Sequence, residues 1–201
     1  PLWPAACVWL RPARPHTADP RRYGFHPTLE PPLRLRAGVS ESQFIEAARG
    51  FAREHRAFEM PALHVGLLGD FLALRPVGDI AASHPLRRFA DACVERFEPL
   101  RAPLGEQELA RRRASGLSAP QQALLERYGY PYVFDEWRFH MTRSDPMRGP
   151  EAAERDALAQ QAQAHFAEAL EVPLCCEELA IFVEPEAGAA FELAERISLK
   201  L

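Results

Sequence analysis

The sequence lacks the features that mark several classes of protein. No apolar run approaches the ~18 residues that a membrane span requires, so we expect no membrane partner. The opening stretch "PLWPAACVWLRPARP" does not have the charged-then-apolar layout of a secretory signal. We therefore expect a cytoplasmic protein. Because the chain opens on Pro rather than Met, we also expect residues of the natural protein to precede it.

Several catalytic and metal-binding signatures are absent as well. The sequence contains no H-E-x-x-H, no zinc-type cysteine and histidine spacing, no G-x-G-x-x-G and no G-x-S-x-G. These absences count against a metallohydrolase, a dinucleotide-binding enzyme and a serine hydrolase. The four cysteines, Cys7, Cys93, Cys175 and Cys176, form no C-x-x-C pair, so we expect reduced, buried thiols. No metal and no cofactor is predicted.

Basic residues are not in excess. The formal net charge is −4 and charged residues make up 26% of the chain, which argues against binding of duplex nucleic acid through a broad basic surface. A short, local phosphate site is still compatible with this composition. With 201 residues, 47% of them hydrophobic, the chain fits a single domain over residues 1–201, which we expect to be a monomer.

Hydrophobic periodicity and turn residues predict helices and strands in alternation. Helices are expected at 41–55, from Ala82 to about 100, in two pieces within 105–128, and at 150–170. Strands are expected at 22–36, in a hairpin over 62–77, at 130–144, and in a final pair around a Gly188 turn. The order strand, helix, hairpin, helix occurs twice in outline, with a helical insertion at about 103–128 between the halves.

Two distant segments share the pattern Phe, His, any residue, Thr. They are "FHPT" at 25–28 and "FHMT" at 139–142. On a strand, residues i and i+2 face the same way, so His26 would project beside Thr28, and His140 beside Thr142. A single His-x-Thr on a strand is common and carries little information. Two of them, each preceded by Phe in an aromatic context, favour a shared function over coincidence.

The paired tripeptides suggest a chemistry. If the two strands lie side by side across a cleft, two imidazoles and two hydroxyls surround one small volume that suits a phosphate. The hydroxyls can donate to non-bridging oxygens, while one histidine takes a proton from the attacking oxygen and the other protonates the leaving oxygen. Histidine suits both roles because its unperturbed pKa is about 6.5. No metal is required.

At these residues the sequence resembles the 2H phosphoesterase superfamily, whose members carry two H-x-[ST]-x motifs, here "HPTL" (26–29) and "HMTR" (140–143). Three longer stretches, "RRYGFHPTLEPPLRL", "LLERYGYPYVFDEWRFHMT" and "ELAIFVEPE…FELAERISL", resemble its branch of uncharacterised proteins associated with phosphonate-metabolism genes.

The resemblance implies an α+β, bilobal fold in which two pseudo-symmetric antiparallel sheets, flanked by helices, surround a central cleft. It implies metal-independent cleavage or formation of phosphodiesters, often of 2′,3′-cyclic phosphate ends of RNA or of small cyclic nucleotides. Carried over by position, His26 and His140 would be the acid–base pair. Thr28 and Thr142 would hold the phosphate.

Three further residues are candidates for substrate binding. Arg138 lies two residues before His140 and is the best cationic candidate for phosphate, the alternative being an ion pair with Asp135 or Glu136. Tyr23 and Tyr132 could stack a base or border the cleft, the alternative being packing in the core.

Two residues depart from the pattern of the branch. Glu30 stands where we expect Lys, and by alternation it would face the side of His26. There it would stabilise protonated His26 and oppose an anionic substrate, unless Arg34 or Arg22 neutralises its charge. Arg143 stands where we expect Leu, and alternation would point it away from His140 to the surface or into a salt bridge.

The leading hypothesis is a metal-independent phosphodiesterase for a cyclic or linear diester of a small nucleotide- or sugar-like molecule, with a link to phosphonate use. One alternative is a non-catalytic protein that binds a phosphorylated metabolite, which Glu30 favours. A second is processing or ligation of RNA 3′ ends, which would need basic surface along the cleft.

Overall fold

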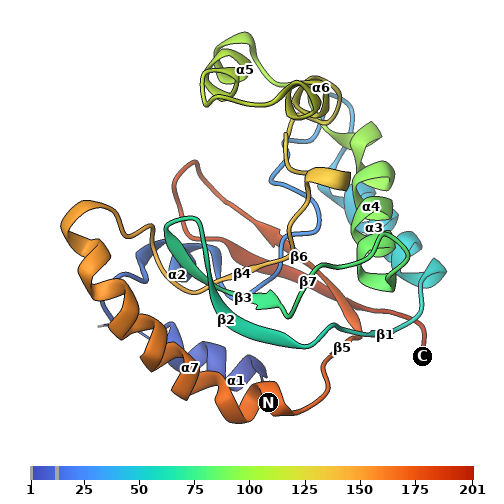
Figure 1. The fold of residues 1–201 in the computed structure, drawn as a ribbon. Coiled ribbons are helices and arrows are strands. Elements are labelled where there is room, and N and C mark those ends of the chain that lie inside the picture. The colour runs from blue at the N-terminus through green and yellow to red at the C-terminus, as the bar shows by residue number, and fades with distance from the viewer. Residues whose placement is uncertain (1, 12–13) are drawn as a thin grey trace.

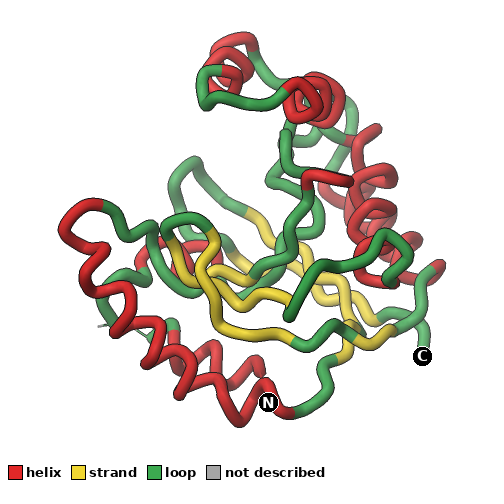
Figure 2. The backbone as a smooth tube through the Cα atoms, in the orientation of Figure 1, coloured by secondary structure: helices red, strands yellow, loops and turns green. Residues whose placement is uncertain are grey.

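The computed structural model describes residues 2–11 and 14–201, with the backbone alone at 150–152. In these residues the fold is α+β, with α-helices around three small antiparallel sheets. Figure 2 shows the strands in the middle of the molecule and the helices around them. The α+β prediction is confirmed, while the bilobal, pseudo-symmetric arrangement around a cleft stays a prediction.

The largest sheet has the strand order β2-β3-β4. A hairpin joins β2 (Leu63–Leu68) to β3 (Phe71–Pro76), and β4 (Met141–Thr142) adds to the other edge of β3. Gly69 has a φ of +62°, the left-handed conformation that such a tight turn requires. Helices α1 (Leu2–Trp9) and α7 (Arg155–Glu171) run together along this sheet, as Figure 1 shows. Their buried faces and the sheet form one hydrophobic cluster.

A second hydrophobic cluster lies among α3 (Glu41–Glu54), α4 (Pro85–Phe97) and the hairpin β6 (Glu178–Val183) and β7 (Glu192–Ser198). Helix α3 begins at a capping box, in which Ser40 and Gln43 satisfy each other's backbone N–H groups. Helix α4 begins after His84, whose side chain accepts the backbone N–H of Leu86.

The remaining elements are short. Figure 1 shows α5 and α6 together, set apart from the sheets. The elements are α2 (Ala18–Tyr23), β1 (Phe58–Glu59), which pairs with β5 (Cys175–Cys176), α5 (Glu106–Arg113), α6 (Ala119–Tyr128), and the 3₁₀ helices η1 (Glu98–Leu100), η2 (Phe134–Glu136) and η3 (Gly149–Glu154).

The predicted helices and both hairpins are confirmed, but two predicted strands are not. Residues 22–36 form the end of α2 and a loop, in which only Leu35 makes a β-bridge, to Arg101. Within 130–144 only Met141 and Thr142 are strand. Prolines account for much of the difference in 22–36, because Pro27, Pro31 and Pro32 have no N–H to give to a ladder. Helices α1 and α2 were not predicted.

The cysteine prediction is half right. All four thiols are free, but only Cys93 is buried, while Cys7 and Cys175 are exposed. Burial raises the pKa of the Cys93 thiol well above its ordinary value. Among residues 2–11 and 14–201, no helix is both long enough and apolar enough to cross a membrane.

Candidate functional site

The first His-x-Thr tripeptide lies in the loop between α2 and α3, not on a strand. Its two side chains nevertheless project together, because Nε2 of His26 is 3.3 Å from Oγ1 of Thr28. The backbone carbonyl of Thr28 accepts a hydrogen bond of 3.2 Å from Nε1 of Trp137. The neighbouring Leu29 packs against both hydrophobic clusters. The loop is thus fixed between the two clusters.

The surroundings of His26 disfavour its charged form. The ring packs on Phe182 of β6, with 5.1 Å between the ring centroids. Burial is the largest influence and lowers the pKa of His26 below its usual 6.5, and the charges of Arg143 and His140 lower it further. The carbonyls of Gly24 and Tyr23 offset part of this. Neither reaches buried Nδ1 in good hydrogen-bond geometry, so within the described residues that atom has no partner.

The second tripeptide begins one residue before β4. Nδ1 of His140 donates to the carbonyl of Arg138 over 2.8 Å, which leaves Nε2 as the lone-pair nitrogen of the neutral ring. The ring contacts Phe71 of β3 at a centroid distance of 5.8 Å. Burial lowers the pKa of His140, the Arg138 carbonyl partly offsets this, and the charge of Arg75 lowers it again.

The two tripeptides lie in the same region of the molecule. A charge on His140 lowers the pKa of His26, which requires the two rings to be within electrostatic range. The hydrogen bond from Trp137 to Thr28 ties the segment before His140 directly to the first tripeptide. Two segments more than a hundred residues apart therefore bring two imidazoles and two threonine hydroxyls into one neighbourhood. This arrangement can move protons to and from a bound anion.

Arg143 departs from its predicted place. It is 0% exposed, not a surface residue, and makes no salt bridge within the described residues. Its guanidinium stacks on Phe25, with Cζ 4.3 Å from the ring centroid, and Nε donates to the carbonyl of Met141. Both terminal nitrogens are buried without a hydrogen-bond partner among those residues. Burial lowers the pKa of Arg143 to about 9.

Glu30 also departs from its predicted place. Its carboxyl interacts with Glu98 and Arg101, and the groups that shift its pKa do not include His26. Burial is the main cause, and with the charge of Glu98 it raises the pKa of Glu30 to about 8. Glu30 is therefore largely protonated at neutral pH. The expectation that Glu30 stabilises protonated His26 is therefore wrong, since the pKa of His26 is lowered and Glu30 is not among the groups that shift it.

The other three predicted binding residues, Tyr23, Tyr132 and Arg138, differ in how much they contact the rest of the protein. Tyr23 packs edge-on against Phe191, with the Arg22 guanidinium over its ring. Tyr132 is exposed and contacts Tyr130. The side chain of Arg138 is exposed, and its expected acidic partners are engaged elsewhere, Asp135 by Arg87 and Glu136 by Gln121. Their roles in binding stay predictions.

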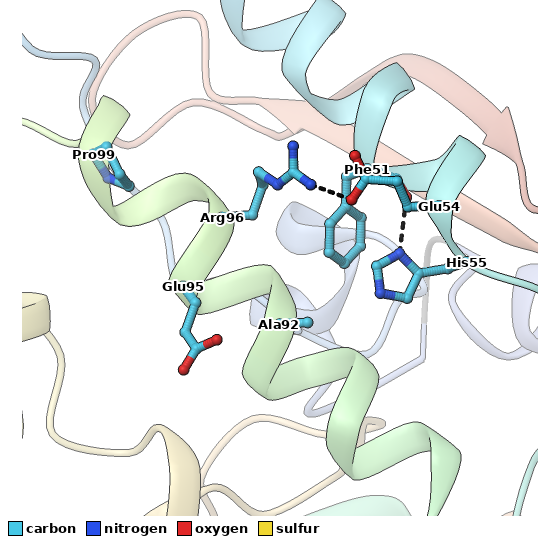
Figure 3. Close-up of a pocket in the computed structure, with 7 residues that line it drawn as sticks. All are labelled: Phe51, Glu54, His55, Ala92, Glu95, Arg96 and Pro99. Carbon is cyan, nitrogen blue, oxygen red and sulfur yellow. Dashed lines mark hydrogen bonds and ion pairs between the residues drawn. The ribbon is translucent and has the colours of Figure 1, made fainter.

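A hollow of about 510 Å³ opens between α3 and α4, and no predicted site residue lines it. Figure 3 shows Arg96 paired to Glu54 and the His55 ring bonded to the carbonyl of Phe51. The lining residues are Phe51, Glu54, His55, Ala92, Glu95, Arg96 and Pro99. Among the described residues, no group of three His, Cys, Asp or Glu side chains is placed to hold a metal ion.

Fold and site together define an α+β chain that brings two His-x-Thr tripeptides near each other. Comparison with known sequences gives the family. Residues 28–192 match the family described as "Protein of unknown function (DUF1045)", and the chain belongs to it. No solved structure gives a significant match.

Two curated relatives carry the same name, "Ribose 1,5-bisphosphate phosphokinase PhnN". The one from Janthinobacterium sp. (strain Marseille) is 43% identical over 182 residues, which are 90% of this chain and 40% of the relative. The one from Laribacter hongkongensis (strain HLHK9) is 35% identical over 191 residues, which are 95% of this chain and 43% of the relative. The chain thus spans about two fifths of the length of these relatives.

Proposed function

We propose that the protein is a metal-independent phosphodiesterase that opens a cyclic or linear phosphodiester of a small, ribose-like molecule. The observation that supports this most is the hydrogen bond from Trp137 to the carbonyl of Thr28, which ties the segment before His140 to the first tripeptide. The effect of a charge on His140 on the pKa of His26 agrees with it. In the proposed step one imidazole takes a proton from water as its oxygen attacks phosphorus. The P–O bond to the leaving oxygen breaks, and the other imidazole protonates that oxygen.

The lowered pKa values of both histidines fit this role in a particular way. In the free protein both rings are neutral near neutral pH, since burial disfavours charge on each. A bound phosphate would raise the pKa of the nearer ring and supply the one protonated imidazole that the step requires. We therefore expect a bell-shaped dependence of kcat/KM on pH, with its centre below about pH 6.5.

Glu30 does not count against this function. A carboxylate beside the phosphate would oppose an anionic substrate and would favour a non-catalytic binding protein. Glu30 instead lies with Glu98 and Arg101, and its pKa of about 8 leaves it largely uncharged at neutral pH. RNA end processing gains no support, because the net charge is −4.

We assign the phosphokinase activity in the relatives' name to the part of those proteins outside the match. The chain has no G-x-x-x-x-G-K-[ST] phosphate loop, and its single lysine, Lys200, is exposed beside the last residue. Kinases of the common classes place a lysine on the nucleotide phosphates. The name nevertheless supports a phosphorylated ribose as the kind of molecule handled. The link to phosphonate use rests on the sequence resemblance.

The test is hydrolysis of 2′,3′-cyclic nucleotides and of cyclic ribose phosphates with EDTA present. We expect turnover that EDTA does not inhibit, and a loss of about 10² or more in His26→Ala and in His140→Ala. Failure of the parent protein to hydrolyse any such diester, while still binding one tightly, would favour the binder instead.

A further inference from the structure

The β2-β3-β4 sheet has one face in the core and one face turned away from it. The core face carries the buried apolar residues Leu63, Val65, Leu72, Leu74 and Met141. Because successive residues of a strand alternate between faces, the residues between them share the other face. Across the three strands Gly66 pairs with Ala73, and Ala73 pairs with Thr142. Thr142 thus stands at the end of a row of very small residues.

The adjacent row on the same face carries His64 and Arg75, which are paired across the hairpin. Continuing the β3–β4 register for two residues beyond Ala73 and Thr142 brings Arg75 opposite His140. Directly opposed residues in an antiparallel pair have Cβ atoms about 4.5–5.5 Å apart. The electrostatics agree with this placement, since the charge of Arg75 acts on His140.

The small residues of this row let the neighbouring side chains lie over it. The His64 ring lies over Gly66, where a Cβ atom would come within 2.8 Å of Cε1 of His64. The guanidinium of Arg75 donates to the carbonyl of Leu67 through Nη1. Within residues 2–11 and 14–201 this is its one hydrogen bond, so its other N–H groups are free to bind an anion.

We propose that Arg75 is a phosphate-binding residue, which donates from its guanidinium to a non-bridging oxygen of the phosphate held beside His140 and Thr142. The inference deepens the proposed function and rests on it. A guanidinium suits the task because its charge is permanent and its paired N–H groups match two phosphate oxygens. Arg75 takes the role that the sequence analysis gave to Arg138. Arg138 lies outside the strands of this sheet, before β4, and its side chain is exposed.

The experiment titrates inorganic phosphate into the protein and follows binding by NMR of the histidine rings. The variants are Arg75→Met, Arg75→Lys and, as a matched control, Arg53→Met, which removes an exposed arginine of α3. We expect Kd to rise about 10- to 100-fold in Arg75→Met, because a charge-assisted hydrogen bond is lost. Arg75→Lys should be intermediate, and Arg53→Met should match the parent.

Two outcomes would overturn the inference. One is an unchanged Kd in Arg75→Met. The other is a large loss in Arg138→Met with none in Arg75→Met. Because Arg75 also bonds to Leu67 across the hairpin, thermal unfolding is measured alongside. A structural role alone would lower Tm and leave the Kd of the folded protein unchanged. Phosphate binding needs no turnover, so an inactive parent would contradict the proposed function without deciding the role of Arg75.

Discussion

The two His-x-Thr tripeptides place similar side chains by different means. The first lies in a loop rich in proline, and His26 is held by packing on Phe182 and by contact with Thr28. The second runs into β4, and His140 is held by a carbonyl hydrogen bond and by the strand pairing of Thr142 with Ala73. The shared pattern therefore describes a chemical requirement, not a common backbone conformation.

An ionisable residue, partly buried in the first case and fully buried in the second, follows each tripeptide, and removal from water moves each toward its neutral form. Glu30 follows the first, with a pKa raised to about 8, and Arg143 follows the second, with a pKa lowered to about 9. The charge of Arg143 lowers the pKa of His26, the histidine of the other tripeptide. Glu30 instead affects Cys93, a thiol of the second hydrophobic cluster, whose pKa it raises. Neither residue behaves as the solvated charge that its sequence position suggests.

The largest expected effect comes from removing both histidines together. If His26 and His140 work on one phosphate, the single alanine variants should each lose about 10²–10⁴ in kcat/KM. The double variant should be scarcely worse than the poorer single one, because groups that act as a unit are strongly non-additive. Steady-state kinetics on a cyclic ribose phosphate measures this. Losses that multiply in the double variant would mean that the tripeptides act independently.

Glu30→Gln should stabilise the protein, and more so at higher pH. The unfolded chain releases the Glu30 proton near pH 4.5 and the folded protein only near 8, so the unfolding free energy of the parent falls as pH rises through this window. The variant escapes this fall and should gain up to about 5 kcal/mol above pH 8.

Urea unfolding of parent and variant at about pH 5, 7 and 9 checks the Glu30 effect. Glu168→Gln, which changes an exposed acid of α7, is the control and should track the parent at every pH. A Glu30→Gln variant whose stability runs parallel to the parent across the range would show that Glu30 ionises normally in the folded protein.

Arg143→Met should also stabilise the free protein, by about 2 kcal/mol, because replacing an unpaired buried charge with an apolar side chain removes its desolvation cost. The same change should raise the pKa of His26, on which the charge of Arg143 acts, and leave that of His140 unshifted. Denaturant unfolding and NMR titration of the two rings measure both effects. Lower stability with an unmoved His26 titration would contradict the buried, unpaired state of Arg143.

The smallest expected effect compares the two threonines. Thr28 is within hydrogen-bond distance of His26, whereas His140 is oriented by a backbone carbonyl instead of by Thr142. Thr28→Val should therefore change the pKa of its histidine, and Thr142→Val should not. Each should lower kcat/KM about 5- to 10-fold through a lost phosphate contact. Equal pKa changes in both histidines would remove this distinction.

Much of the fold was predictable because it is set by local sequence. The caps at Ser40 and Ser118 and the turn of the hairpin at 62–77 depend on a few neighbouring residues, and the helices and the hairpin lie where the sequence predicts them. The strand predicted for 22–36 failed because its aromatic and leucine residues pack against the clusters from a loop. Hydrophobicity alone does not distinguish that from a strand.

The candidate site was less predictable because it depends on pairing between distant segments. Alternation along β3 puts Arg75 on the face of Ala73, and this could have been read from the hairpin. Strand β4 joins the same sheet and so brings His140 opposite Arg75, but nothing in the local sequence of either segment indicates this pairing. The surface position predicted for Arg143 was wrong for a related reason. Alternation tells which face of the sheet a residue lies on, but it does not tell that α1 and α7 cover that face.

The central claim is that the two imidazoles share one anion, and a phosphate titration followed at both histidines tests it most directly. With EDTA present, the ring signals of His26 and His140 should move together, fit a single Kd, and report a raised pKa for at least one ring when phosphate is bound. Signals that move at only one histidine, or that fit two unrelated Kd values, would contradict the account.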